Sequence, residues 1–175
     1  MGRIGTFSTA TEVLPDLSCF GKGLGGGMPV SAVAGTEDAM GAWQESTGEA
    51  IHTGTFFGHP LSCAVAVATL NAIIEDQLIE RSLITGSWVQ AYLGEKLSGI
   101  VHPTRIRGKG LMIGIDLGEN GDGVAVVENL ARCGVIVIPS GHKGRVVSIT
   151  PALNIPEGLL TEGLDRIVAS IRSNS

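Results

Sequence analysis

Two lysines of this chain stand in the same tetrapeptide, Gly-Lys-Gly-Leu, and their neighbours indicate whether either can do chemistry. Lys22 lies in the first copy and Lys109 in the second. Lys22 follows the apolar run 17–20 and precedes the glycine-rich run 23–27, so we expect its side chain to leave the end of a buried strand where backbone can approach a ligand closely. A lysine that is partly removed from water is nucleophilic enough to form an imine with an aldehyde. A structural lysine is the competing interpretation, because glycine clusters often serve only as tight turns.

The second lysine has different neighbours. Lys109 follows Arg105 and Arg107 and leads directly into an apolar run that begins at Leu111. Charged residues in loops are usually solvated. We therefore interpret Lys109 as an exposed turn lysine with no role in chemistry.

The glycine-rich run also matches nucleotide-binding patterns, but its context excludes them. Gly21, Gly23 and Gly26 satisfy G-x-G-x-x-G, yet the chain continues through Pro29 into an apolar strand, with no helix whose N-terminus could hold a pyrophosphate. A P-loop places its lysine after the last glycine, whereas Lys22 precedes the run. The pattern therefore predicts neither a dinucleotide site nor a nucleotide kinase.

Charge and composition restrict the partners further. A net charge of −5 and a pI near 5.3 argue against a nucleic acid or an anionic membrane, because both favour a basic face. The most apolar run, 61–74, is too short and too polar for a membrane span, and the first residues do not resemble a signal peptide. The chain has an odd number of cysteines, which lie far apart: Cys19, Cys63 and Cys133. We therefore expect neither disulfides nor a metal site. A protein of the reducing cytoplasm fits this pattern best.

Alternating apolar runs and helical stretches predict an α/β or α+β protein. In the first part we expect short buried strands at Leu17–Phe20 and Val30–Ala34 on either side of the glycine-rich loop. Thr36 is expected to cap a short helix, and Pro60 to begin a buried helix that runs to about residue 74.

The pattern changes near residue 77, where we expect a domain boundary. Apolar residues three to five apart predict one face of a long amphipathic helix: Ile79, Leu83, Ile84, Trp88, Tyr92, Leu93 and Leu97. Further strands are expected at 111–117, 135–138 and 146–149, with helices at 123–132 and after Pro156, the last with Leu159, Leu160, Leu164, Ile167, Val168 and Ile171 on its apolar side. We expect residues 78–175 to form a compact domain, whereas residues 1–77 offer too few elements to cover one another.

Four segments in order resemble the C-terminal half of class III aminotransferases, the pyridoxal-phosphate enzymes that include 4-aminobutyrate and acetylornithine aminotransferases. They are PDLSCFGKGLGGGMPVSAVAGTEDAM, HTGTFFGHPLSCAVAVATL, RIRGKGLMIGIDL and ITPALNIPEGLLTEGLDRI, and together they cover nearly the whole chain. The first is specific to that family, and the last is weak alone. The resemblance implies the α/β fold of type I pyridoxal-phosphate-dependent transferases. Residues 1–77 would be part of the large cofactor-binding domain, and residues 78–175 the small α+β C-terminal domain.

The resemblance also implies roles for three residues. Lys22 matches the lysine that forms a Schiff base with pyridoxal phosphate and, once displaced by substrate, carries the proton. Thr55 matches the threonine that reaches the cofactor phosphate from the neighbouring subunit of a dimer, and its hydroxyl and amide are suitable donors. Arg107 matches the arginine that in many members pairs with the substrate carboxylate, a role that suits the guanidinium fork. Taken alone, Thr55 would be read as a strand-end residue and Arg107 as a surface charge.

The chain departs from its relatives at its start. In the family, the aspartate on the pyridine nitrogen, a glutamine, the stacking aromatic and the phosphate loop all lie upstream of the position of Met1. We therefore expect the polypeptide alone not to be a competent transaminase. It could be an expressed fragment, a truncated reading frame or one part of a split enzyme, acting as a homodimer or with a complementing N-terminal half.

Alternatives in function remain open from the sequence. The uncovered first segment suits a non-catalytic assembly fragment that dimerises or docks on a full-length relative. An aminomutase or racemase of the same superfamily is a weaker possibility. The substrates would be an amino acid and a 2-oxo acid. Gly54 stands where acetylornithine-type members often have serine, which tilts the prediction slightly away from them.

Overall fold

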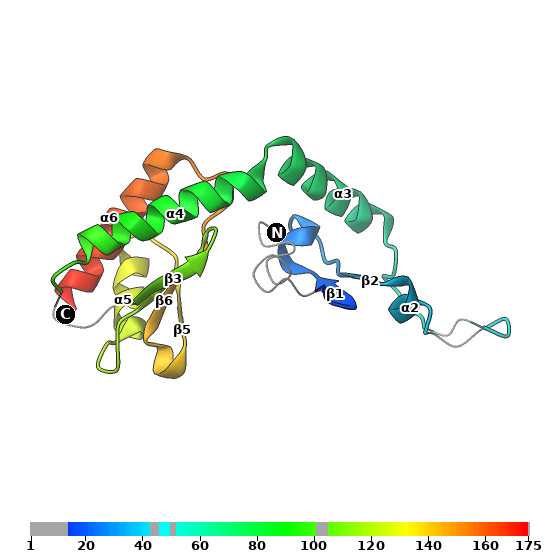
Figure 1. The fold of residues 1–175 in the computed structure, drawn as a ribbon, viewed down its shortest axis with the longest axis horizontal. Coiled ribbons are helices and arrows are strands. Elements are labelled where there is room, and N and C mark those ends of the chain that lie inside the picture. The colour runs from blue at the N-terminus through cyan, green and yellow to red at the C-terminus, as the bar shows by residue number, and fades with distance from the viewer. Residues whose placement is uncertain (1–13, 43–45, 50–51, 101–104, 175) are drawn as a thin grey trace. The chain divides into compact units, whose positions relative to one another are not determined.

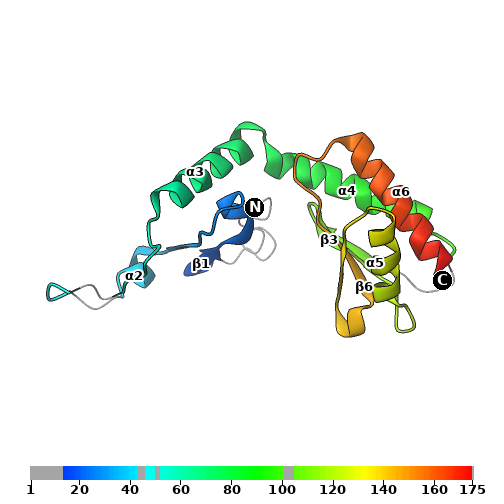
Figure 2. The ribbon, with the colours of Figure 1, turned by 180° about the vertical axis from the view of Figure 1, so that it is seen from behind.

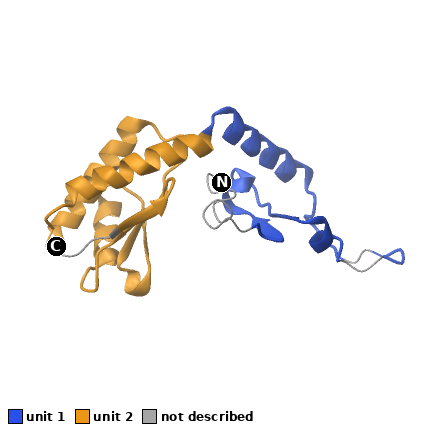
Figure 3. Ribbon diagram, viewed as in Figure 1, with its two compact units in different colours: residues 1, 3–77 blue, residues 2, 78–175 orange. Residues whose placement is uncertain are grey.

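The computed structural model describes residues 14–42, 46–49, 52–100 and 105–174. Contacts divide the chain between Gln77 and Leu78 into two compact units, shown in blue and orange in Figure 3. Each unit is described by itself.

The second unit is built on a four-stranded antiparallel sheet. Its strands are β3 (Arg105–Lys109), β4 (Met112–Asp116), β5 (Ile138–Ser140) and β6 (Val146–Ile149). The spatial order is β3-β4-β6-β5, so β6 lies between β4 and β5. Strands β3 and β4 form a hairpin in which Lys109 pairs with Met112, and Gly110 at the turn has a φ of 54°, which glycine adopts without steric cost.

Three helices cover one face of this sheet, as the opposite views of Figures 1 and 2 show. They are α4 (Leu78–Lys96), α5 (Gly123–Arg132) and α6 (Glu157–Ser173). The sheet contributes alternate residues to the core, which is the period of two expected of a strand with one buried face. The core also takes one stripe from each helix: Val89, Leu93 and Leu97 from α4 and its end, Val126 and Leu130 from α5, and Leu160, Leu164, Ile167, Val168 and Ile171 from α6.

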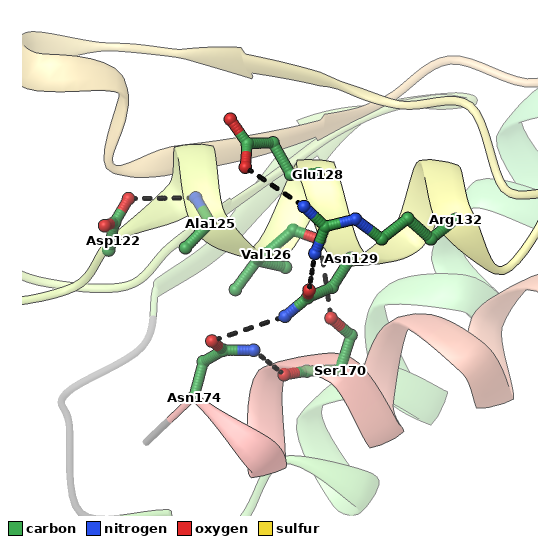
Figure 4. Close-up of polar contacts among 8 residues, drawn as sticks. All are labelled: Asp122, Ala125, Val126, Glu128, Asn129, Arg132, Ser170 and Asn174. Atoms are coloured by element: carbon green, nitrogen blue, oxygen red, sulfur yellow. Dashed lines mark hydrogen bonds and ion pairs between the residues drawn. The ribbon is translucent and has the colours of Figure 1, made fainter.

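Polar contacts join α5 to α6 at the rim of the core (Figure 4). The Ser170 hydroxyl donates to the carbonyl of Val126 at 3.4 Å, and the Asn129 amide donates to the Asn174 side chain at 3.5 Å. Asp122 caps the start of α5 by accepting from the amide of Ala125 at 3.0 Å. The first two contacts link the two helices directly, and the third closes the first turn of α5.

The buried face of α4 differs from the predicted face. The residues that lie inward are Leu78, Ser82, Gly86, Val89 and Leu93. The predicted Ile79, Leu83, Ile84 and Trp88 are 40–66% exposed, whereas Leu93 is buried as predicted. The cause is Gly86. A Cβ there would lie 2.1 Å from the carbonyl oxygen of Gly110, so the helix turns its small residues toward the β3–β4 hairpin.

The remaining predictions for this unit are confirmed except at two strands. Strands β4 and β6 and helices α5 and α6 lie where the sequence places them, although Leu159 on α6 is 58% exposed. The strand predicted at 135–138 begins at Ile138 instead. Strand β3 was not predicted, because its alternating arginines and glycine conceal the apolar pattern of a strand.

The first unit has few elements. Strands β1 (Leu17–Phe20) and β2 (Ala32–Gly35) form an antiparallel pair, joined by the short 3₁₀ turn η1 (Lys22–Gly25) and residues 26–31. Helix α2 (Glu37–Met40) begins at Thr36, whose hydroxyl accepts from the amide of Ala39, as predicted. Helix α3 (Pro60–Glu75) has its proline in the first turn, also as predicted.

Burial in the first unit was predicted wrongly. Residues of β1 are exposed or half-buried, all of β2 is exposed, and only Ser62, Ala66 and Ile73 of α3 are buried. Within this unit one hairpin, a short 3₁₀ turn and two helices, one of them a single turn, cannot enclose apolar side chains on all sides. The outcome matches the expectation that these elements would not cover one another.

No single helix in the described part of the chain is long and apolar enough to cross a membrane. Only α3 and α4, taken together across the break between them, pass such a test by length and composition.

Candidate functional site

Lys22 lies just beyond β1, at the first position of η1. Its φ is 48°, in the left-handed region that non-glycine residues rarely adopt. Its side chain is exposed in the isolated chain, and the buried surroundings predicted for it are wrong, because β1 itself is exposed. The position at a strand end next to the glycine-rich loop is as predicted. Gln77 and Lys143 are the other described non-glycine residues with positive φ.

The glycine-rich loop is fixed to helix α3. Leu24 and Gly25 are buried, and a Cβ on Gly26 would lie 2.8 Å from Oγ1 of Thr69 and 3.0 Å from Cγ1 of Val65. Gly26 also has a φ of 53°. Glycine is therefore required here both by backbone conformation and by the close approach of the helix. The contact anchors the backbone turn that carries Lys22.

Thr55 lies in the turn 55–58, immediately before α3. Its side chain is exposed, and the turn is closed by a hydrogen bond of 3.0 Å from the amide of Phe57 to the carbonyl of Gly54. His59 caps the helix through Nδ1, which accepts from the amide of Ser62 at 3.4 Å. Thr55 therefore lies in a turn. Taken without the family resemblance, the residue was expected at the end of a strand, and that expectation is wrong. The Thr55 turn and the Lys22 turn are attached to the same helix.

Arg107 lies in the second unit, on the face of the sheet opposite the three helices. It pairs in register with Gly114 of β4, and its side chain is 62% exposed. Nη1 lies 3.8 Å from Oδ2 of Asp116, whose side chain is only 5% exposed. The guanidinium group is thus held near a carboxylate but remains open to solvent.

Two residues of this face were missed by sequence reasoning. Asp116 is a buried carboxylate at the end of β4, and Arg145 contacts it through Nε at 3.1 Å and Nη2 at 3.4 Å. An acidic residue closing an apolar run was the available signal, but its partners become apparent only from the strand register.

Lys109 is the last residue of β3 and is exposed. The turn itself falls on the next two residues, Gly110 and Leu111. In the first unit the Lys22 turn packs against α3, and the Thr55 turn leads into the N-terminus of the same helix. Arg107 lies in the second unit beside Asp116 and Arg145.

Comparison with known proteins matches nearly the whole chain to one family. A family model described as aminotransferase class-III matches residues 1–171. An ornithine aminotransferase of Bacillus cereus is 39% identical over 90% of this chain and 38% of its own length. A 5-aminovalerate aminotransferase of Pseudomonas aeruginosa is 33% identical over 93% of this chain and 40% of its own length.

Solved structures give the same result. The ornithine aminotransferase of Toxoplasma gondii, described with partial occupancy of PLP at its active site, has a TM-score of 0.84 and 32% identity. The match covers 95% of this chain and 38% of that one. The chain spans about two fifths of the length of these relatives.

Proposed function

The chain belongs to the class III aminotransferases, a family that uses pyridoxal phosphate, and on that premise we propose that it carries the lysine-bearing part of such an enzyme. The proposed reaction moves an amino group from an amino acid to a 2-oxo acid. The observation that carries the proposal is the placement of Lys22 in a left-handed backbone conformation on a glycine-rich turn anchored to α3. A non-glycine residue in that conformation costs free energy, and such cost is commonly retained at functional sites.

Lys22 supplies two chemical roles through one atom. Its Nζ would hold pyridoxal phosphate through the cofactor's aldehyde, with loss of water, and the same Nζ, once released, would accept and return a proton at the substrate carbon. The cofactor, when bound, supplies the electron sink for the charge that develops on that carbon. The exposed side chain and the anchored backbone suit both roles, because the amine is accessible while its base is fixed.

Thr55 is proposed to bind the cofactor phosphate. Its exposed hydroxyl lies in a turn fixed by the N-terminus of α3. A hydroxyl and a backbone amide can both donate to a phosphate dianion. We place this phosphate in the site of a second subunit, so the proposed assembly is a homodimer or a dimer with a complementing N-terminal portion.

Arg107 is proposed to bind the carboxylate of the substrate. Its guanidinium group is mostly exposed, and Nη1 lies 3.8 Å from Oδ2 of Asp116. An arginine fork binds a carboxylate with two parallel hydrogen bonds. Arg107 therefore retains donors for an incoming acid.

The two units take the places of two domains in this proposal. Residues 1–77 form part of the large cofactor-binding domain, and residues 78–175 form the small C-terminal domain. The packed sheet and helices of the second unit support the latter assignment. The amino donor is proposed to be an ω-amino acid, since the relatives include ornithine and 5-aminovalerate aminotransferases. The exposed thiols of Cys19, Cys63 and Cys133 favour the cytoplasm.

A chimera tests the activity. The segment of the Bacillus cereus relative that precedes its matched portion is joined to this chain, and amino transfer from ornithine and from 5-aminovalerate to 2-oxoglutarate is measured. Lys22→Ala is expected to lower kcat by about a thousandfold or more, because both roles of Nζ are lost. Lys109→Ala is the matched control and is expected to stay within about twofold of the parent. A folded chimera that retains its rate with Lys22→Ala contradicts the proposal.

A second candidate function is an assembly fragment without catalysis. Large apolar side chains of the first unit are exposed, among them Leu14 (84%), Phe56 (77%) and Ile74 (70%). Such side chains mark an interaction surface when they are contiguous. Light scattering of the chain discriminates this candidate: stable dimers without cofactor binding favour it, and a monomer contradicts it. A chimera that is monomeric and binds no cofactor contradicts both functions.

A further inference from the structure

We infer that Thr69 of α3 is a positioning residue for Lys22. Its hydroxyl oxygen determines where the glycine-rich turn rests on the helix, and so the direction in which the lysine side chain leaves the backbone. The inference deepens the proposed function and rests on the role of Lys22 stated there. It concerns the first unit alone and assigns a role to a residue that the family resemblance did not single out.

The side chain of Thr69 has a fixed orientation. It is half-buried, and its hydroxyl donates to the carbonyl of Val65, one helical turn earlier, with an Oγ1–O distance of 2.9 Å. The hydroxyl hydrogen is thus used within the helix, as is usual for a threonine in a helix interior. Oγ1 is therefore held at one place on the surface of α3, whether or not the loop is present.

The backbone of Gly26 packs directly against this oxygen. A Cβ on Gly26 would lie 2.8 Å from Oγ1 of Thr69 and 3.0 Å from Cγ1 of Val65, so the glycine fits closely onto both side chains. A methyl group is larger than a hydroxyl oxygen, and closely packed atoms accept extra volume only by moving. Replacement of Oγ1 by a methyl group is therefore expected to push Gly26 away from α3.

Hydrogen bonds of the turn carry such a shift to the lysine. The amide of Gly26 donates to the carbonyl of Gly23 at 3.3 Å, and the amide of Leu24 donates to the carbonyl of Gly21 at 3.1 Å. Lys22 lies between Gly21 and Gly23, with its φ of 48° set by this turn. A displacement of the turn changes the direction of the Lys22 side chain. A misplacement of about 1 Å at a reacting group can cost about a hundredfold in rate.

Two substitutions at Thr69 separate the oxygen from the rest of the side chain. Thr69→Val keeps the shape but replaces Oγ1 by a methyl group, whereas Thr69→Ser keeps Oγ1. In the 175-residue chain, hydrogen exchange of the Leu24 amide is expected to become about tenfold faster in Thr69→Val and to stay within about threefold of the parent in Thr69→Ser. This measurement needs no cofactor and no activity.

The same variants are compared by kcat and KM in the chimera with the Bacillus cereus segment. Thr69→Val is expected to lower kcat about tenfold and to leave the KM for ornithine within about twofold, because Lys22 moves the proton but does not hold the substrate. Thr69→Ser is expected to retain kcat within about threefold. A loss of stability alone would not separate the two variants in this way.

Val67→Thr is the matched control. It makes the reverse exchange, from methyl group to hydroxyl, on the same helix at a residue that is 56% exposed, and it is expected to change Leu24 exchange by less than about twofold. The inference is overturned if Thr69→Val leaves either the exchange rate or kcat unchanged, or if Thr69→Ser reproduces its effects. If the chimera retains its rate with Lys22→Ala, the proposed function is contradicted, and Leu24 exchange still decides whether Oγ1 sets the position of the turn.

Discussion

The two Gly-Lys-Gly-Leu copies have the same four residues but different backbone conformations. In the first copy the left-handed residue is the lysine, because Lys22 has a φ of 48°. In the second copy it is the following glycine, because Gly110 has a φ of 54° and Lys109 is an ordinary strand residue. The tetrapeptide thus does not determine which residue takes the unfavourable conformation.

The surroundings of the two copies explain the difference. The second copy closes a hairpin in the packed unit, where Gly110 lies against Gly86 of α4. The first copy lies in a unit with little core, where the loop is held through Gly26 on α3. A glycine at the left-handed position of the second copy serves packing. In the first copy the left-handed residue is instead the lysine, in a conformation that costs free energy, which supports the chemistry proposed for Lys22.

The largest contrast is expected between the cores of the two units. Leu93 in the second unit is fully buried, and Leu93→Ala is expected to lower the free energy of unfolding by about 2–5 kcal/mol. Ile74 in the first unit is 70% exposed, and Ile74→Ala is expected to cost less than about 1 kcal/mol. Urea unfolding monitored by circular dichroism measures both. Equal losses would show that the exposed face of α3 is covered in solution.

Substitution of two glycines of α4 tests how the helix packs against the second Gly-Lys-Gly-Leu copy, at the β3–β4 hairpin. A Cβ at Gly86 meets backbone of Gly110 at 2.1 Å, so Gly86→Ala is expected to destabilise by about 2–3 kcal/mol. A Cβ at Gly94 meets nothing within 4 Å, and Gly94→Ala is expected to stabilise by about 1 kcal/mol through helix propensity. Thermal unfolding measures whether each substitution raises or lowers the stability of the unit. Stabilisation by Gly86→Ala would contradict the close approach of α4 to the hairpin.

Glycine substitution of the two lysines tests the comparison itself. Lys22→Gly relieves the left-handed conformation and is expected to slow exchange of the Leu24 amide, by an amount equivalent to about 1 kcal/mol. That amide donates to the carbonyl of Gly21 across the turn. Lys109→Gly removes a strand side chain and is expected to destabilise the hairpin by about 1 kcal/mol. If both substitutions stabilised the local structure, or both destabilised it, the proposed difference in backbone conformation would be contradicted.

The smallest effect concerns Tyr92, which reports on the second unit alone. The hydrogen bond from Tyr92 of α4 to Asp165 of α6 raises the pKa of the tyrosine, with a smaller contribution from burial and then from the Asp165 charge. The resulting stability is present below pH 10 and is lost as the pH rises through the folded-state pKa. Since the chain has one tyrosine, its absorbance titration is unambiguous. Asp165→Asn should lower the midpoint, and an unchanged midpoint would contradict the contact.

Sequence reasoning succeeded where the local signal was strong. The cap at Thr36, the proline in the first turn of α3, the strands β4 and β6 and the helices α5 and α6 follow from turn chemistry and apolar period. It failed where a distant residue decides the outcome. The inward face of α4 is set by the backbone of Gly110, which no periodicity within the helix encodes. Arg145 and Asp116 likewise meet only through the register of β4 and β6.

For the candidate site, as for the fold, the sequence predicted some features and missed others. The family resemblance named Lys22, Thr55 and Arg107, and those assignments stay predictions. The structure contributes what sequence could not: the φ of Lys22, the shared attachment of the Lys22 and Thr55 turns to α3, and the carboxylate beside Arg107. Burial of Lys22 was predicted wrongly, because a short apolar run was taken to indicate a covered strand.

The most direct test of the account is to locate the lysine that condenses with pyridoxal phosphate. The chimera described above is mixed with limiting pyridoxal phosphate and reduced with borohydride, and the labelled peptide is identified by mass spectrometry. The account predicts that Lys22 carries the pyridoxyl group and that Lys109, in the same tetrapeptide, carries little. Equal labelling of the two lysines, or label that avoids Lys22, would contradict it.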